Sequence, residues 1–355
     1  MTLLLNTEDT ARLVGTRDAV EALDNAYRAL AEHDATHRVR SDMIVATSAE
    51  DVYTLATMEG AIKSLGVAAI RLRSDYARRV ERHGVASSVK WASSPGLYCG
   101  LVILYSLENA EPLAILNDGY LQVMRVGATS ALAGRYLARP ESSVLGIIGA
   151  SHQARGHARA YAATFPLQLI KVFSRTPEER ERFAVEMSGE LGVTCRAVGS
   201  AKEAAQGSDI VAACTSSRVP VLEDERWIDD GSYTSSIRWF NEFGRAHTKL
   251  VDLFVLHNET YGPVLRAGRE EDFAQGPAAG RERKEALPEG AALLHDVVGG
   301  KVDGRTDPGQ RTFFNNNAGK GIQFAALAKL AYERALEADL GRQLPTEWFL
   351  QDIST

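Results

Sequence analysis

The spacing of hydrophobic and polar residues divides the chain into regions of different character. Residues 8–33 carry apolar side chains near helical spacing, which predicts an amphipathic helix. Short β-rich runs follow between residues 41 and 125, separated by turn-prone stretches at 93–96 and 108–111. The runs cover residues 51–56, 67–73, 100–105 and 112–116. We therefore expect a mostly antiparallel sheet built of hairpins.

A second pattern begins after an Ala-rich, apolar stretch at 127–138, which predicts a buried helix ending at Arg139 and Pro140. Apolar runs now alternate with helical stretches at 152–164 and 177–191. The predicted strands cover residues 143–149, 167–173, 194–198, 209–214, 232–237 and 249–255. Apolar strands that alternate with helices indicate a parallel sheet covered on both faces. A last helix is predicted at 319–340.

Composition narrows the class of protein. The 355 residues are 45% hydrophobic and 24% charged, which fits a globular protein of about two domains. A net charge of −6 argues against a nucleic-acid binder. No apolar run reaches the roughly 18 residues of a membrane span, and the N-terminus does not resemble a signal peptide, so we expect a cytoplasmic protein. Three distant cysteines and scattered histidines predict no disulfide framework and no metal site.

The turn after the first apolar strand of the second region carries a candidate nucleotide loop. Gly149 matches the tight-turn glycine of G-x-G-x-x-G/A, and Ala154 matches the small residue that allows close helix packing. Ser151 stands at the middle glycine. The strand and helix around the loop are the context that the motif requires, whereas a plain tight turn is the alternative. The predicted cofactor contacts here are Gly149, Ala150, Ser151, His152, Gln153 and Ala154.

The end of the next strand favours one cofactor over another. NAD-selective folds place an acidic residue there to bind the ribose hydroxyls. This chain instead has Ser174, Arg175 and Thr176. A guanidinium beside hydroxyl groups suits a 2′-phosphate, so we predict NADP, with NAD as the less favoured alternative. Arg175 on a solvated strand end is the other interpretation.

The segment 118–138, which contains Arg125, leads within a few residues into Gly146-Ile-Ile-Gly-Ala-Ser-His-Gln-Ala-Arg155. This joint motif resembles the ornithine cyclodeaminase/μ-crystallin family, and further matches include residues 209–217 with Thr215, Leu250-Val-Asp252 and 296–304. The resemblance implies a homodimer and a Rossmann-type domain at 139–318. That domain is inserted into a mixed α+β substrate-binding and dimerisation domain of residues 1–138 plus 319–355. It also implies that Thr215 contacts the cofactor.

The activities of this family imply hydride transfer to or from an α-carbon, which is bonded to an amino or imino nitrogen and to a carboxylate. Such a reaction needs a cationic side chain that binds the carboxylate and a group that transfers a proton at the nitrogen. By the resemblance, Arg125 matches the carboxylate-binding arginine, Arg40 a second contact, and Asp252 the acid that orients the amine. Asp252 as a strand-end cap is the alternative.

Two departures from the family pattern alter the expected chemistry. Arg71 stands where the family has a lysine, with Arg73 two residues further on the same strand face. Arginine keeps the charge but is a poor proton donor, so acid/base work would move to Asp252, Lys63 or water. Phe324 replaces an acid of the last helix. A charged outer strand face is the alternative interpretation of the arginines.

The favoured hypothesis is an NAD(P)H-dependent imine or ketimine reductase, or an amino-acid dehydrogenase, acting on a small anionic α-imino or α-amino acid. The candidate catalytic residues are Asp252, Arg71 and Lys63, and the candidate carboxylate clamps are Arg40, Arg73 and Arg125. An ammonia-releasing cyclodeaminase and a non-catalytic NADP-binding protein remain alternatives. The substrate side chain is left open.

Overall fold

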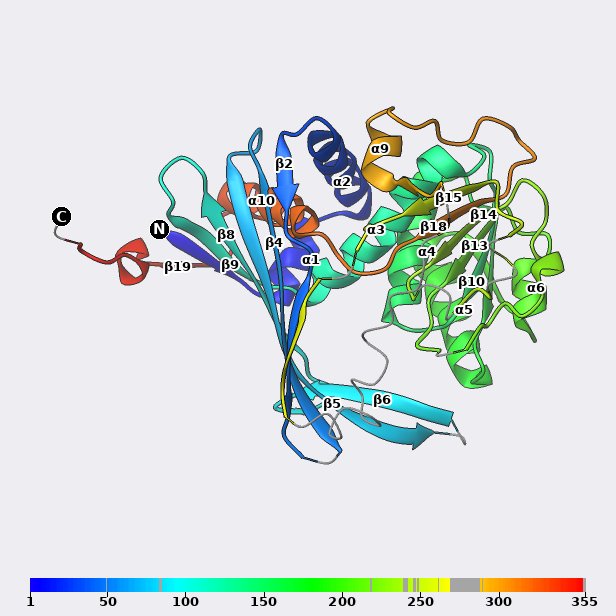
Figure 1. The fold of residues 1–355 in the computed structure, drawn as a ribbon, viewed down its shortest axis with the longest axis horizontal. Helices are drawn as coiled ribbons and strands as arrows, with labels where there is room; N and C mark the ends of the chain where they lie inside the picture. The colour runs from blue at the N-terminus through cyan, green and yellow to red at the C-terminus, as the bar shows by residue number, and fades with distance from the viewer. Residues whose placement is uncertain are drawn as a thin grey trace.

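The computed structural model describes residues 1–353 except 49, 83–84, 218, 239–241, 245–246, 248, 261, 269–287 and 289. Its described residues form two β-sheets with helix α3 (Gly119–Leu137) between them (Figure 1). Because α3 packs against helices of both halves, it fixes one sheet relative to the other. The predicted α/β class with a Rossmann-type sheet is confirmed.

The second sheet consists of eight described strands, all parallel. In spatial order they are β12 (Thr194–Ala197), β11 (Leu169–Phe173), β10 (Val144–Ile148), β13 (Ile210–Ala213), β14 (Tyr233–Ser236), β18 (Thr312–Asn315), β15 (Leu253–Leu256) and β17 (Ala292–Leu293). The first six strands follow the 3-2-1-4-5-6 order of dinucleotide-binding folds.

Alternating side chains of β10 explain why this sheet is covered on both faces. Ile147 faces one core together with residues of α4 (His152–Thr164) and α5 (Pro177–Leu191). Ile148 faces the other core, which includes α6 (Ala201–Ala205). An uninterrupted apolar run is thus the pattern of a strand buried on both sides.

The first sheet has eleven described strands and is mixed. Its main path is β16 (Val264–Ala267), β3 (Ser41–Ala46), β4 (Asp51–Ile62), β5 (Val67–Arg82), β8 (Cys99–Ser106), β9 (Pro112–Asn117), β1 (Thr2–Leu5) and β19 (Arg342–Leu344). Strand β2 (Ala35–His37) pairs with β4, and β6 (Val85–Ala92) pairs with β5 and β7 (Ser94–Pro95). The predicted hairpins correspond to β4, β5, β8 and β9.

Only the inner face of this sheet is covered by helices of the described chain. Every second residue of β4 is buried, and α10 (Gly321–Ala338) packs on that face, with α1 (Thr7–Leu13) and α2 (Thr16–Ala31) beside it. The approach is close: a Cβ on Gly60 would lie 2.3 Å from the backbone nitrogen of Ile322. The last helix therefore returns to the N-terminal sheet.

Several elements differ from the sequence-based expectation. The helix expected at 8–33 is two helices, because Val14 is extended and Gly15 begins α2 as its N-cap. Helix α3 begins at Gly119, eight residues before the Ala-rich run. Strand β1 was not predicted, since its short apolar run becomes a strand only through pairing with β9 and β19.

Strand β5 is much longer than the predicted run at 67–73, and with β6 it forms an arm that projects from the sheet (Figure 1). Aromatic side chains line this arm. The ring of Tyr76 stacks on Trp91 at a centroid distance of 5.9 Å, and the guanidinium of Arg78 lies 5.6 Å from the Trp91 ring. These contacts stabilise a hairpin that has no described helix behind it.

The chain passes between the two halves more than twice. Strand β16 lies in the range expected for the nucleotide domain, yet it pairs with β3 of the first sheet. Helix α9 (Leu294–Val298) packs on α2. Among the described residues, the remaining short helical turns are Glu225–Trp227 and Thr346–Phe349. Among the described residues, no helix combines the length and apolarity needed to cross a membrane.

Helices α3 and α4 cross at two glycines. A Cβ on Gly127 would lie 2.4 Å from the carbonyl oxygen of Gly156, and a Cβ on Gly156 would lie 2.7 Å from Cγ1 of Val123. The helix that joins the two halves therefore packs backbone to backbone on the helix that opens the nucleotide domain.

We predict that Gly127→Ala lowers the free energy of unfolding by about 3 kcal/mol, because the backbone that the methyl group meets cannot move aside. The matched control is Gly189→Ala in α5, where an added Cβ meets nothing within 4 Å. That control should be stabilising by about 0.5–1 kcal/mol. Urea unfolding midpoints would compare them, and equal effects of the two substitutions would contradict the importance of this close packing.

Candidate active site

The turn between β10 and α4 has the shape that a dinucleotide loop requires. Gly149 has a φ of 112°, and a Cβ there would lie 2.5 Å from the carbonyl oxygen of Cys214. Ala154 is fully buried. Glycine is therefore needed at the first position, and a small side chain suits the close helix–sheet contact at the last.

The first turn of α4 leaves polar groups available at the carboxyl end of the sheet. Ser151 is the N-cap residue of the helix, but its side chain makes no capping bond. Ser151 and His152 are exposed, and Oε1 of Gln153 is buried without a hydrogen-bond partner in the described structure. Arg155 donates a hydrogen bond of 2.6 Å to the carbonyl of Ala150 and holds the loop in place. Free N–H groups of a helix start suit a pyrophosphate.

The residues that follow β11 add two hydroxyl groups and a cation to the same carboxyl end of the sheet. Arg175 is exposed. Thr176 precedes α5 without capping it through its side chain, and its N–H donates to Oγ of Ser174 at 3.3 Å. Arg180 donates to the carbonyl oxygen of Ser174 at 2.8 Å. The structure therefore brings the predicted residues together beside the second strand, where the adenosine half of a dinucleotide lies in this fold.

A buried carboxylate, Glu242, binds the residues that follow β13 and β14, on the other side of β10 at the same end of the sheet. Its Oε1 accepts the N–H and the hydroxyl of Thr215 at 2.6 and 2.8 Å, and its Oε2 accepts the hydroxyl of Ser236 at 2.8 Å. Burial raises the pKa of Glu242, against the effect of these hydrogen bonds. The loops after β13 and β14 are thereby tied together. Glu242 was not predicted from the sequence, because it lies in a loop without a recognisable motif.

Two asparagines end β18 at the same edge. The side chain of Asn315 is fully buried, and neither its oxygen nor its nitrogen has a hydrogen-bond partner in the described structure. Asn316 donates from Nδ2 to the carbonyl of Val126 and to Oγ of Ser130, both at 2.8 Å. The strand end is thus tied to α3. Three consecutive asparagines at 315–317, at the end of an apolar strand, are the sequence feature that could have identified these residues.

These groups fit a nicotinamide dinucleotide. The glycine turn and free helix start suit the pyrophosphate, the end of β11 suits the adenosine half, and an unpaired buried carboxamide lies where the nicotinamide half would lie. Gly149, Ser151 and the strand-end groups Ser174, Arg175, Thr176 and Thr215 would hold the cofactor. When bound, it supplies the hydride.

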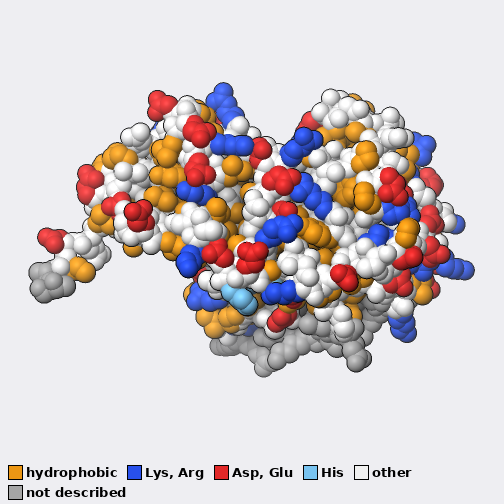
Figure 2. All heavy atoms as spheres, turned by 90° about the horizontal axis from the view of Figure 1, so that it is seen from above, with side chains coloured by type: hydrophobic (Ala, Val, Ile, Leu, Met, Phe, Trp, Pro, Cys, Tyr) orange, Lys and Arg blue, Asp and Glu red, His pale blue; other side chains and the backbone are white. Residues whose placement is uncertain are grey.

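The four predicted arginines gather on the inner side of the first sheet. Arg71 and Arg73 lie on β5, Arg40 precedes β3, and Arg125 lies on α3; their charges act on one another. Figure 2 shows Lys/Arg and Asp/Glu side chains interspersed on the surface and an outline notched between two lobes. The surface is therefore mixed in sign, whereas the four arginines lie close enough together for their charges to interact.

Arg71 is held by an aspartate at the start of α3. Its Nε lies 2.6 Å and its Nη2 2.5 Å from Oδ2 of Asp118, and both side chains are buried. Gly100 makes room for the pair, since a Cβ there would lie 2.0–2.4 Å from the Asp118 carboxylate. The structure therefore shows Arg71 as one half of a buried ion pair.

Arg40 and Arg73 share aspartates in the same way. Arg40 donates twice to Oδ1 of Asp42, at 2.6 and 3.1 Å. Arg73 lies 3.7 Å from that oxygen and 3.1 Å from Oδ2 of Asp75. Burial lowers the pKa of Arg73 to about 9, with the charge of Arg40 acting in the same direction. Two cations and two anions thus nearly cancel.

Arg125 differs from the other three. In the described part of the chain no carboxylate lies within ion-pair distance of it, and its partners are the amide oxygens of Gln122 at 3.1 Å and Gln323 at 3.4 Å. Burial lowers its pKa to about 9, with Arg71 contributing in the same direction. Phe324 stands at the position where an acid was expected, and its ring centroid lies 5.5 Å from Cζ of Arg71 and 5.6 Å from Cζ of Arg125. Arg125 is thus a buried cation whose charge is left unbalanced by the described residues.

Two predicted catalytic residues lie away from this cluster. Lys63 is exposed in the turn between β4 and β5. Asp252 lies at the amino end of β15, where its Oδ2 accepts the N–H of Arg311 at 2.7 Å. The ligand edge of a parallel sheet is its carboxyl end. The position of Asp252 therefore corresponds to the alternative of a strand-end cap.

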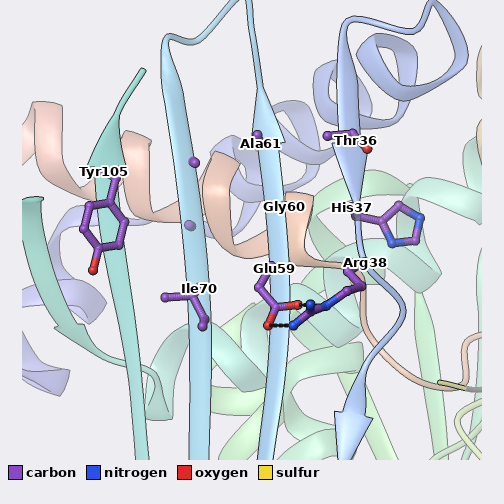
Figure 3. A pocket seen from close by; sticks show the side chains of 10 residues that line it. Thr36, His37, Arg38, Glu59, Gly60, Ala61, Ile70 and Tyr105 are labelled. Atoms are coloured by element: carbon purple, nitrogen blue, oxygen red, sulfur yellow. Dashed lines mark hydrogen bonds and ion pairs between the residues drawn. The ribbon is translucent and has the colours of Figure 1, made fainter. Parts of the chain in front are cut away.

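An open depression of about 460 Å³ lies on the uncovered face of the first sheet (Figure 3). Figure 3 shows its strands in front of the helices and Arg38 bonded twice to Glu59, at 2.7 and 2.9 Å. The arginine cluster lies on the opposite face of those strands. The depression is therefore not the candidate active site. No group of residues suited to hold a metal ion occurs among the described residues.

Comparisons with known proteins agree with this geometry. Residues 91–339 match the ornithine cyclodeaminase/mu-crystallin family. A putative dehydrogenase of Rhizobium meliloti is 29% identical over 316 residues, which cover 82% of this chain and 93% of that protein. A Delta(1)-pyrroline-2-carboxylate reductase of Bacillus cereus is 27% identical over 248 residues, which cover 69% and 74%.

A solved structure extends the similarity over nearly the whole chain. The Delta(1)-pyrroline-2-carboxylate reductase of Thermococcus litoralis, in complex with NADH and L-proline, gives a TM-score of 0.79 at 26% identity and covers 97% of this chain and 100% of that one. With its Rossmann-type sheet, its glycine turn and its buried Arg125, this chain belongs to the ornithine cyclodeaminase/mu-crystallin family.

Proposed function

We propose that the chain is an NADP(H)-dependent reductase of small α-imino acids, working in reverse as an amino-acid dehydrogenase. The observation that carries the proposal is Arg125, a buried cation without a carboxylate partner among the described residues. It lies one residue before Val126, whose carbonyl is bonded to Asn316 at the end of the sixth Rossmann strand. A substrate carboxylate on Arg125 would therefore lie at the nicotinamide half of the fold.

Three of the four arginines are paired with aspartates, which leaves Arg125 as the cation available to a substrate and favours a substrate with one carboxylate. Asp118 balances Arg71, whereas Asp42 and Asp75 balance Arg40 and Arg73. Among the paired arginines, the Arg40 side chain is the most accessible, at 23% against 13% for Arg73 and 5% for Arg71. In the proposal Arg40 is accordingly the second contact of the carboxylate, and Arg73 orients it through Asp42.

In this reaction the imine carbon accepts a hydride and the imine nitrogen accepts a proton. Imine, NADPH and one proton give amine and NADP⁺. Arg125 binds the carboxylate in the imine and in the amine, and it orients the carbon toward the cofactor edge. The buried surroundings of Arg125 strengthen this contact because they exclude water.

We favour reduction over the redox-neutral release of ammonia. That reaction needs an acid to bind a second amino group, and Asp252 lies at the far edge of the sheet. Near Arg125, the carboxylate of Asp118 is committed to Arg71. Phe324 presents a ring where the family carries an acid.

The preference for NADP is part of the same proposal. An exposed guanidinium and two hydroxyl groups stand at the end of β11, and the segment 174–176 contains no acid. A 2′-phosphate would find a cation there, whereas the free hydroxyls of NAD would lack a carboxylate partner.

We also propose a homodimer formed through the open face of the first sheet. That face has no covering helix among the described residues, and it exposes 44% of Met43 on β3, 57% of its neighbour Leu265 on β16 and 37% of Leu101 on β8. Apolar side chains on a sheet face without a cover are typical of an interface.

We predict that Arg125→Gln lowers kcat/KM for α-imino acid reduction by about 100-fold or more, because the carboxylate loses its charged partner in a buried site. The matched control is Arg78→Gln on the projecting arm, where an exposed ion pair with Asp51 is removed. That control should stay within about twofold of the wild type. NADPH absorbance follows the reaction, and a similar rate for both variants would refute the clamp.

For the cofactor, we predict that the wild type has a lower KM for NADPH than for NADH. Arg175→Ser should raise the KM for NADPH about tenfold and leave that for NADH nearly unchanged, since only the 2′-phosphate contact is lost. Steady-state kinetics with both cofactors would test this, and a wild-type preference for NADH would contradict the assignment.

A further inference from the structure

The proposed reaction needs a proton at the imine nitrogen, and the three predicted catalytic side chains are not placed to supply it. Arg71 is paired with Asp118, and this ion pair favours the charged form of the guanidinium. Lys63 and Asp252 lie at other places in the fold. The donor is therefore to be found among the buried titratable groups around Arg125.

Lys320 is such a group. It precedes α10 and is only 3% exposed. Its Nζ lies 2.8 Å from Nε2 of His37 on β2, and the carboxylate whose charge attracts it is that of Glu259. The ammonium donates a hydrogen bond to the imidazole, which holds the lysine head group in place. The Nδ1 atom of His37 is buried without a partner in the described structure.

The backbone around Lys320 is attached to the carboxylate clamp. A Cβ on Gly319 would lie 2.8 Å from Nη1 of Arg125, so this glycine backbone packs directly on the guanidinium. Oε1 of Gln323 accepts the N–H of Lys320 at 3.0 Å and a bond from Arg125 at 3.4 Å. The lysine and the clamp are therefore held by the same turn.

The groups facing Lys320 come from several elements. His37 lies on β2, His295 on α9, and His257 and Glu259 after β15. His257 experiences the charges of both Lys320 and Arg125. Burial lowers the pKa of Lys320 to about 8, against the attraction of Glu259, and burial lowers the pKa of His37 to about 4, with Lys320 acting in the same direction. At neutral pH the lysine is thus charged and His37 is neutral.

We propose that Lys320 is the catalytic acid that protonates the imine nitrogen, with His37 as its positioning partner. The inference rests on the proposed reductase function. As the hydride reaches the imine carbon, an N–H bond of the ammonium breaks and its proton forms the new N–H bond of the amine. Lys320 is left neutral and then takes up a proton from water. In the reverse reaction the neutral amine of Lys320 accepts the proton.

The test compares Lys320→Met and Lys320→Arg with the wild type. The matched control is Lys329→Met, on the same helix, where the lysine pairs with Glu333 at 3.1 Å. Three quantities are measured: kcat for imino acid reduction, kcat/KM as a function of pH, and the Kd of NADPH from its fluorescence. His37→Gln is a fourth variant that keeps Lys320.

The expected wild-type kcat/KM is constant below pH 8 and falls about tenfold for each pH unit above it, because the acid form is lost. Both Lys320 variants should lose about 100-fold or more in kcat and lack this alkaline limb, with the Kd of NADPH unchanged. Lys329→Met should behave as the wild type. His37→Gln should move the alkaline limb of the kcat/KM profile to a different pH and should keep part of the wild-type kcat.

A Lys320→Met variant that keeps a kcat within about threefold of the wild type, or keeps the alkaline limb, would overturn the inference. If Lys320→Met does not fold, His37→Gln decides, since an unshifted limb would also overturn it. A wild type that reduces no imino acid in a broad panel would instead overturn the proposed function.

Discussion

The structure depends on one constraint: a guanidinium without a carboxylate partner among the described residues is buried where the two halves of the molecule meet. Arg125 lies on α3, the helix that packs on both halves, and it is held by amide oxygens of Gln122 and Gln323. A buried charge without a counter-ion is costly, and the cost falls when an anion binds. The same helix is tied to the carboxyl end of the Rossmann sheet through Asn316. The fold thus holds an unsatisfied positive charge beside the cofactor edge.

The roles of the other arginines follow from this arrangement. Arg71 replaces the lysine that the family pattern leads one to expect, and Asp118 neutralises it within the space that Gly100 provides. Where the resemblance leads to the expectation of a titratable lysine, the structure has a buried ion pair at the start of the helix that carries Arg125. Acid/base chemistry then has to come from another element, and Lys320 at the start of α10 is buried in the same neighbourhood.

Local signals in the sequence predicted a substantial part of the fold and of the site. Gly149 and Ala154 were identifiable because a glycine turn between an apolar strand and a helix is typical of a dinucleotide-binding fold, and Arg125 because its motif leads directly into that turn. Glu242 and Lys320 were not predicted, since their roles depend on contacts between distant segments: Glu242 joins two strand-end loops, and Lys320 meets His37 across 283 positions of sequence.

Asp252 and Lys63 do not lie at the candidate active site because of where the fold places their segments. Asp252 follows the family motif in sequence, yet it lies at the amino end of β15, because the apolar strand begins only at Leu253. Lys63 lies in a turn whose backbone is bonded to Asp34.

The most direct test of the carboxylate clamp is calorimetric binding of pyrrole-2-carboxylate and of its neutral carboxamide to the protein saturated with NADP⁺. We predict that the carboxylate binds at least about 100-fold more tightly than the amide, and equal affinity for the two would contradict the clamp.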